Sequence, residues 1–259
     1  MTLIEVVAIL LAGVAAGTIN TIVGSGTLIT FPTLLAFGYS PIVANISNNI
    51  GLVPGGVSGT IGYRRELVGQ GGRLRQLAPL SLAGGASGAL LLFILPPAAF
   101  AAIVPALLAV AVVLVIIQPW MKATLARRRA GREVTPRGAR TNTLLVQVGV
   151  FLAGAYGGYF GAAQGVLLVG LLGMLLPETL QRINAVKNVL SLVVNGVSTA
   201  VFVTVAFDQI DWLVVLLIAS GSMIGGVIGA RVGRRMPAAV LRAVIVIVGT
   251  VAIVKIVTA

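Results

Sequence analysis

The sequence contains no cysteine and no histidine, and only 9% of its 259 residues are charged. Without cysteine, neither a disulfide nor a thiolate metal site can form. Without histidine, the commonest metal ligand and proton shuttle is missing as well. We therefore expect a protein that uses neither a metal ion nor another cofactor.

The scarcity of charge also excludes a soluble fold, because a soluble domain carries about 25% charged residues. Hydrophobic residues make up 58% of the chain, and the mean hydropathy is +1.08. No Asp, Glu, Lys or Arg lies between Glu5 and Arg64, or between Arg75 and Lys122. A helix needs about 20 apolar residues to cross a bilayer core of about 30 Å, so each gap holds several crossings. The sequence predicts an all-α, polytopic transmembrane helix bundle.

Glycine, proline and charge clusters divide the chain into ten apolar segments. They are 3–23, 27–38, 41–62, 76–95, 99–119, 142–160, 164–176, 183–206, 212–230 and 240–257. The segments 27–38 and 164–176 are short for a crossing, and each follows a glycine-rich break. Each is expected to be the returning arm of a bent or re-entrant hairpin. The first segment lacks the basic start of a cleavable signal, so we expect it to be retained.

The basic residues predict how the chain is oriented, since cytoplasmic loops are enriched in Lys and Arg. Four clusters, at 64–75, 122–140, 182–187 and 231–242, contain every basic residue except Lys255. All four are expected on the cytoplasmic side. This sorting, together with attraction of the central linker 121–141 to anionic lipid headgroups, explains the net charge of +12. No nucleic-acid partner is expected, because no recognition module accompanies the charge.

The two halves of the chain repeat one another. Ala16-Gly17 followed by Gly24 matches Ala153-Gly154 followed by Gly161, and Asn48 with Gly56-Val57-Ser58 matches Asn188 with Gly196-Val197-Ser198. We expect an N-terminal repeat at 1–120, the basic linker at 121–141 and a C-terminal repeat at 142–259. Each repeat is a bent hairpin followed by three full spans, and the predicted orientation makes the two repeats inverted. Many secondary transporters share this architecture and bind substrate near the midplane, at the repeat interface.

The two glycine-rich breaks are the first candidate site. Glycine lets the backbone leave the helix and approach a ligand closely, and a half-helix that restarts there presents its N–H groups and positive dipole end to an anion. The candidate residues are Asn20, Thr21, Gly24, Ser25, Gly26 and Thr27 in the first half, and Gly161, Gln164 and Gly165 in the second. Tight helix packing is the alternative, because Gly13/Gly17, Gly157/Gly161 and Gly225/Gly229 are all small-xxx-small pairs. Packing is favoured for Gly225/Gly229, and a cavity for the two breaks.

A second polar set begins the span after each hairpin. It contains Asn45, Ser47, Asn48 and Asn49 in one half, and Asn184, Lys187, Asn188 and Asn195 in the other. The candidate site residues among them are Asn45, Asn48, Asn49, Asn184, Lys187 and Asn188. Residues three or four apart share a helix face, so an oxyanion at that face would meet several donors and one positive charge. The alternative is that Lys187 extends to the membrane interface while the amides bond between helices.

No Asp or Glu lies deep in a predicted span, so a carboxylate proton relay through the membrane is not expected. A membrane enzyme is also disfavoured, since metal or nucleophilic catalysis would depend on Ser or Lys alone. We expect no catalytic residue.

The first half contains the run Ala16-Gly17-Thr18-Ile19-Asn20-Thr21-Ile22-Val23-Gly24-Ser25-Gly26, followed by Pro32, the Asn-rich start of the next span and Tyr63-Arg64-Arg65. This pattern resembles the TauE/SafE sulfite exporter family. The second-half run from Gly154 to Gly165, with Asn184 to Asn188, is similar to the family's internal repeat. The resemblance implies transport of sulfite, sulfoacetate or related organic anions across the bacterial cytoplasmic membrane, commonly as export.

The sequence therefore predicts a multi-pass secondary transporter of the bacterial inner membrane that exports a small sulfur-containing anion, such as sulfite or an organosulfonate, by alternating access. A passive anion channel or a structural membrane subunit is the alternative. The expected partners are the small anionic substrate and membrane lipids, including anionic headgroups. A monomer and a homo-oligomer both stay open.

Overall fold

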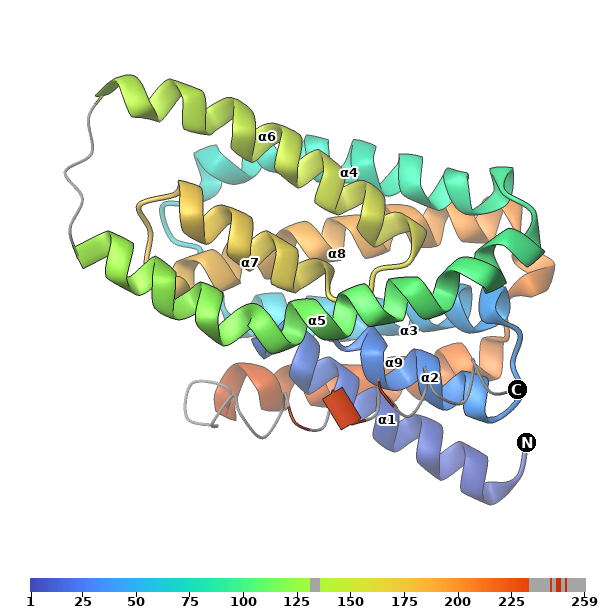
Figure 1. The fold of residues 1–259 in the computed structure, drawn as a ribbon. Helices are drawn as coiled ribbons and strands as arrows, with labels where there is room; N and C mark the ends of the chain where they lie inside the picture. The colour runs from blue at the N-terminus through green and yellow to red at the C-terminus, as the bar shows by residue number, and fades with distance from the viewer. Residues whose placement is uncertain (131–135, 233–242, 244–245, 248–249, 251–259) are drawn as a thin grey trace.

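The computed structural model describes residues 1–130, 136–232, 243, 246, 247 and 250. Within that part of the chain every regular element is helical, which confirms the all-α fold class (Figure 1). The elements are α1 (Leu3–Ile22), α2 (Thr27–Ala36), α3 (Pro41–Gly62), α4 (Gly71–Ile94), α5 (Pro97–Ala130), α6 (Pro136–Tyr159), α7 (Gln164–Leu175), α8 (Leu180–Val205), the short 3₁₀ helix η1 (Phe207–Gln209) and α9 (Trp212–Val232). The predicted span 240–257 lies almost entirely outside the described residues.

The helices follow the predicted segments closely except around the expected linker 121–141. There α5 continues to Ala130 and α6 already begins at Pro136, so most of that segment is helical. Between Met121 and Ala130 the sequence consists mainly of Ala, Leu, Met, Lys and Arg, which are the best helix formers. The charges mark where the apolar stretch ends, whereas the helix runs on beyond it.

Five described helices are long and apolar enough to cross a membrane: Leu3–Ile22, Gly71–Ile94, Pro97–Trp120, Leu180–Val205 and Trp212–Val232. With 10 and 12 residues, α2 and α7 are about 15 and 18 Å long and too short to cross alone. Although α3 has 22 residues, four consecutive turns of it carry asparagine, serine or glycine and lower its hydropathy. Most of the first half of α3 is buried by neighbouring helices.

Two close helix pairs frame the bundle, and each joins the two halves of the chain. Glycines of α1 and α9 face each other, and a methyl group added at Gly225 would collide with the carbonyl oxygen of Val14. Glycines of α4 and α6 meet in the same way, and a methyl group at Gly88 would collide with the carbonyl oxygen of Ala155. Small residues let helix backbones approach closely where lipid gives no hydrophobic drive. The packing role predicted for Gly225/Gly229 is therefore confirmed.

Between these pairs, α3 and α8 lie side by side in the middle of the bundle. Figure 1 shows that α1 begins at the right-hand end of the bundle and α6 at the left-hand end. The two helices that precede the glycine-rich breaks therefore enter from opposite ends.

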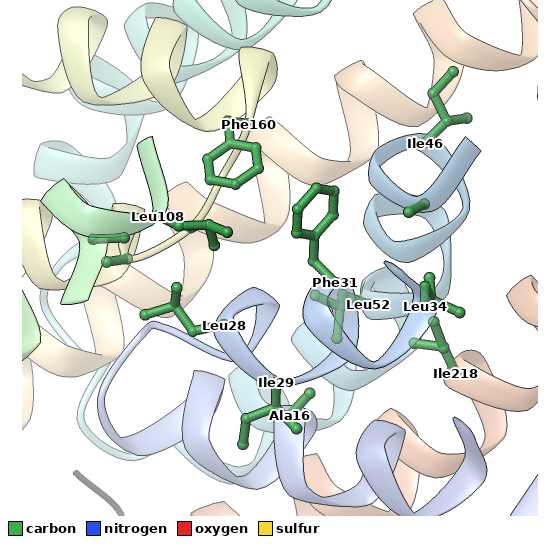
Figure 2. Close-up of a cluster of buried hydrophobic side chains, with 14 of the residues drawn as sticks. Ala16, Leu28, Ile29, Phe31, Leu34, Ile46, Leu52, Leu108, Phe160 and Ile218 are labelled. Atoms are coloured by element: carbon green, nitrogen blue, oxygen red, sulfur yellow. The ribbon is translucent and has the colours of Figure 1, made fainter. Parts of the chain in front are cut away.

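An aromatic contact joins the two hairpins. The rings of Phe31 in α2 and Phe160 in the α6–α7 turn pack edge to face, with centroids 5.1 Å apart. Figure 2 shows this pair with Leu28 and Leu108 at one side and Leu34 at the other. Aromatic pairs of this geometry contribute about 0.5–1.5 kcal/mol beyond the area that they bury. The main hydrophobic cluster thus surrounds the place where the two breaks come together.

Candidate functional site

The two glycine-rich breaks touch in the interior of the bundle. Gly24 and Gly161 adopt φ angles of +90° and +77°, which favour glycine and let each helix end and restart. The backbone N–H of Gly165 donates to the carbonyl oxygen of Gly24 over 3.0 Å. A methyl group on Gly24 would collide with the backbone of Gly165. The two backbones can pack this closely because both positions are glycine. The break of each half therefore lies directly against the break of the other half.

A small polar cavity adjoins this contact. Its lining comes from both halves: Asn20, Gly24, Thr27, Asn49, Leu52, Gly161, Gln164, Gly165, Ser191 and Asn195. The cavity volume is about 10 Å³, which is room for about one water molecule. A second cavity of the same size shares three of these residues and adds Thr21, Gly55, Gly56, Asn188 and Leu192. Among the described residues no charged side chain lines either cavity.

Several buried polar atoms near the cavities have no hydrogen-bond partner among the described residues. They are Asn49 Oδ1, Gln164 Nε2, Asn188 Nδ2 and Ser191 Oγ, and each belongs to a residue that lines one of the two cavities. An unpaired buried polar group costs about 1–3 kcal/mol. Such atoms mark a place where a water or a polar solute supplies the missing partner.

The carbonyl groups at the end of α1 accept hydrogen bonds from side chains of other helices. The ammonium of Lys187 donates to the carbonyl oxygens of Asn20 and Thr21, over 2.8 and 3.3 Å. Asn184 Nδ2 also donates to the Thr21 oxygen, over 3.1 Å, and Gln118 Nε2 donates to the Val23 oxygen, over 3.3 Å. These carbonyls lie beyond the reach of helical N–H groups. Residues of α8 and α5 thereby hold the break of α1 in place.

The end of α6 is held in a simpler way. Asn45 Nδ2 of α3 donates to the carbonyl oxygen of Tyr159 over 3.0 Å, and the Tyr156 hydroxyl donates to the Ala162 oxygen over 2.6 Å. Ala163, which precedes α7, has a φ of +61° that is uncommon for a residue with a side chain. The second break therefore carries backbone strain where it faces the first.

Seven of the predicted site residues line the first cavity: Asn20, Gly24, Thr27, Asn49, Gly161, Gln164 and Gly165. Thr21 and Asn188 line the second. The remaining six, Ser25, Gly26, Asn45, Asn48, Asn184 and Lys187, line neither. Asn48 bonds to α2 instead, since its amide donates to Thr27 Oγ1 over 3.3 Å and its oxygen accepts from the Thr30 hydroxyl.

The alternative roles considered for the polar set are resolved by these contacts. Lys187 does not extend to the membrane interface, because only 1% of the residue is exposed and its ammonium binds carbonyls of α1. Asn45 and Asn184 do bond between helices. The N–H groups expected to face an anion are partly occupied, since Gly165 N–H binds Gly24 and Gly26 N–H binds Asn20 Oδ1 over 3.5 Å.

Two polar residues that line the cavity are not among the predicted substrate-binding residues: Ser191, which was missed, and Asn195, which belongs to the second polar set. Both lie on α8, three and seven residues after Asn188. Residues at that spacing share one helix face. The helical period of polar residues, continued from Asn188 to Asn195, would have found Ser191 as well.

An ionic network ties the two halves together at the arginine-rich end of the bundle. Glu178, in the α7–α8 loop, pairs with Arg73 at 2.9 Å and with Arg182 at 3.0 Å. Arg182 also donates to the carbonyl oxygen of Val68, in the α3–α4 loop, over 3.1 Å. Burial acts to raise the pKa of Glu178, but hydrogen bonds from Gln70 and Arg73 and the charges of both arginines outweigh it, so the pKa is lowered.

A family model described as "Sulfite exporter TauE/SafE" matches residues 9–256. The chain belongs to the TauE/SafE family. Among curated relatives of this TauE/SafE protein, "Probable membrane transporter protein ORF9" of Sinorhizobium sp. is 30% identical over 239 residues, which cover 92% of this chain and 86% of the relative. "Probable membrane transporter protein" of Haemophilus influenzae is 29% identical over 254 residues, covering 94% and 91%. No solved structure matches the chain.

Family membership, the names of the relatives and the five apolar helices agree with one another. This TauE/SafE protein is a multi-pass membrane transporter. The predicted family is thereby confirmed, and the cavity at the two breaks is the candidate site where it binds its substrate.

Proposed function

We propose that this protein is a secondary transporter that exports a small sulfur-containing anion, such as sulfite or an organosulfonate, across the bacterial inner membrane by alternating access. One observation carries the proposal: a glycine-rich break from each half meets the other at Gly24 and Gly165, beside a polar cavity that both halves line. Discontinuous helices that meet near the midplane form the substrate sites of many secondary transporters.

The packing of the helices supports an inverted repeat. In the proposed repeat, α6 to α9 correspond to α1 to α4. The close pair α1 with α9 then corresponds to α6 with α4, and α3 packs against its own counterpart α8. Those relations are what a two-fold axis between the halves requires. The opposite ends at which α1 and α6 begin in Figure 1 support the same arrangement.

The donors around the cavities suit an oxyanion. Gln164 Nε2, Asn188 Nδ2 and the Ser191 hydroxyl are neutral donors that find no partner in the part of the chain that the structure describes, and Asn195 adds a further side-chain amide. A sulfite or sulfonate group presents three oxygens and can accept several such bonds at once. Neutral donors hold an anion without a buried ion pair, so the anion is also able to leave.

The size of the cavity supports a carrier over a passive channel. With room for about one water, the cavity is too small in this conformation for a solute of four or more heavy atoms. The Gly24–Gly165 contact and the ionic network of Glu178 would have to open to admit it. A gated carrier requires such movement, whereas an open pore does not.

Flux into proteoliposomes tests the proposed function. We expect uptake of radiolabelled sulfite, isethionate or both to saturate with concentration and to be accelerated by the same anion inside. Gln164→Ala and Asn195→Ala should raise KM, while Gly196→Ala is a matched control because a methyl group there meets no atom within 4 Å. Absence of flux for every sulfur anion would refute the proposed substrate class, and flux that rises linearly without saturation would favour a channel.

A further inference from the structure

Lys187 is a buried cation that the substrate cavity does not use. Only 1% of the residue is exposed. It lies on α8, which is one of the helices long and apolar enough to cross a membrane. Its ammonium binds the carbonyl oxygens of Asn20 and Thr21, in the last turn of α1. That end of a helix carries the negative end of the macrodipole, so it favours a cation.

The position is one that other transporters give to a free ion. In transporters built on discontinuous helices, the carboxyl end of a half-helix and the unwound carbonyls beside it coordinate the coupling sodium ion or proton. A lysine ammonium is a compact single positive charge with three donors. We propose that Lys187 is a tethered cation that takes the place of a free coupling cation at the break of α1. This inference rests on the proposed transport function.

The contacts of Lys187 show how it would act. Its stem packs against the start of α7, since a methyl group on Gly165 would lie 2.9 Å from Lys187 Cδ. Lys187 therefore joins α8 to the end of α1 and to the start of α7. The cavity is lined by residues at the same two places, Asn20, Gly24 and Gly165. It is a positioning residue that acts on the substrate through the end of α1.

The other break has no such cation among the described residues. The end of α6 is served by the neutral amide of Asn45. In the alignment of the halves that pairs Asn48 with Asn188, Ser47 occupies the position of Lys187, and its hydroxyl accepts from the backbone N–H of Asp211 over 3.0 Å. The proposed cation site is thus a property of one half only, and Asn184 and Asn45 provide neutral controls.

Wild-type flux gives the first test. Exchange of isethionate or sulfite in proteoliposomes should proceed at the same rate in choline buffer as in sodium or potassium buffer, because the cation is supplied by the chain. A requirement of the wild type for sodium or potassium would overturn the proposal.

Removal of the side chain gives the second test. In Lys187→Ala we expect Vmax to fall about tenfold or more, since two buried carbonyls lose a charged donor, with KM little changed. Methylammonium, which restores a primary ammonium, should raise Vmax saturably, and tetramethylammonium at the same concentration should not. Asn184→Ala and Asn45→Ala should show no such restoration. Full activity of Lys187→Ala without an added cation would overturn the proposal.

A binding measurement separates this inference from the proposed function. Methylammonium should raise the thermal stability of purified Lys187→Ala saturably, because it binds the folded state, and should leave the wild type unchanged. A wild type that moves no sulfur anion would refute the proposed function, while the thermal shift would still decide the cation site. An active wild type with no methylammonium effect on Lys187→Ala would refute the tethered cation alone.

Discussion

The contact between the two breaks predicts that the substitution Gly165→Ala disables the protein. The added methyl carbon would lie 2.5 Å from Gly24 Cα, 2.9 Å from Lys187 Cδ and 3.0 Å from the Gly24 carbonyl oxygen. Two of these three atoms are backbone, so they cannot turn aside as a flexible side chain could. The backbones of the two breaks must separate to make room.

The expected cost follows from overpacking, which amounts to about 1–3 kcal/mol for extra methyl groups in a packed interior. We expect Gly165→Ala to fall at the upper end, and Gly24→Ala to lose about 1–2 kcal/mol more because its φ of +90° disfavours a side chain. Gly196→Ala is the matched control, since Gly196 lies within α8 and faces open space. It should be neutral, or stabilising by up to about 1 kcal/mol.

Thermal inactivation in detergent, followed by size-exclusion chromatography, measures the effect without requiring reversible unfolding. Anion flux in proteoliposomes measures whether the site survives. If Gly165→Ala were as stable and as active as Gly196→Ala, the two breaks could not be packed as closely as the structure has them, and the shared cavity would have to be abandoned.

Three further outcomes are expected. Glu178→Gln should lower stability near neutral pH by about 1 kcal/mol or less. Because folding lowers the pKa of Glu178, the difference in stability from the wild type should persist at pH values above the unfolded pKa of about 4.3 and vanish as the pH falls through the lower, folded pKa. Thermal inactivation measured over pH 3–7 would show this. Asn195→Ala, scored by saturation of uptake, should raise KM by about tenfold for the loss of one donor bond to an anion, and an unchanged KM would remove Asn195 from the site. In this cysteine-free chain, Ala123→Cys, at an exposed position, should react with a membrane-impermeant thiol reagent in inverted vesicles and resist it in intact cells; the reverse pattern would contradict the proposed cytoplasmic linker.

Features that depend on local chain chemistry could be predicted from the sequence. Glycine at Gly24 and Gly161 identified both breaks, because few other residues adopt a positive φ. The polar run at the start of the spans after the hairpins identified part of the cavity, including Asn49 and Asn188. Five of the predicted apolar segments coincide with described helices that are long and apolar enough to cross a membrane.

Partner choice could not be predicted, because it depends on tertiary packing. The sequence leaves two roles open for Lys187, which are to face an oxyanion beside Asn184 and Asn188 or to extend to the membrane interface. In the structure its ammonium binds carbonyls of α1, in the other half of the chain. Asn48 likewise lies on a polar face and yet bonds to Thr27 and Thr30 of α2. One polar helix face can serve a ligand, a neighbouring helix or both, and the spacing of residues does not distinguish these uses.

The two ends of the bundle are closed by different chemistry. In the proposed repeat, the α7–α8 and α3–α4 loops, which Glu178 and Arg182 join, correspond to the loops that carry Tyr39 and Asp211. At that second end burial raises the pKa of Tyr39. The negative charges of Asp211 and Glu5, and the hydrogen bond that the hydroxyl donates to Asp211, raise the pKa further, so a neutral phenol faces two carboxylates. An ion pair weakens with salt whereas a hydrogen bond from a neutral donor is less affected. Equivalent loops would therefore close the two ends unequally. Under the proposed alternating access, a change in ionic strength would then shift the balance between the form open to one side of the membrane and the form open to the other.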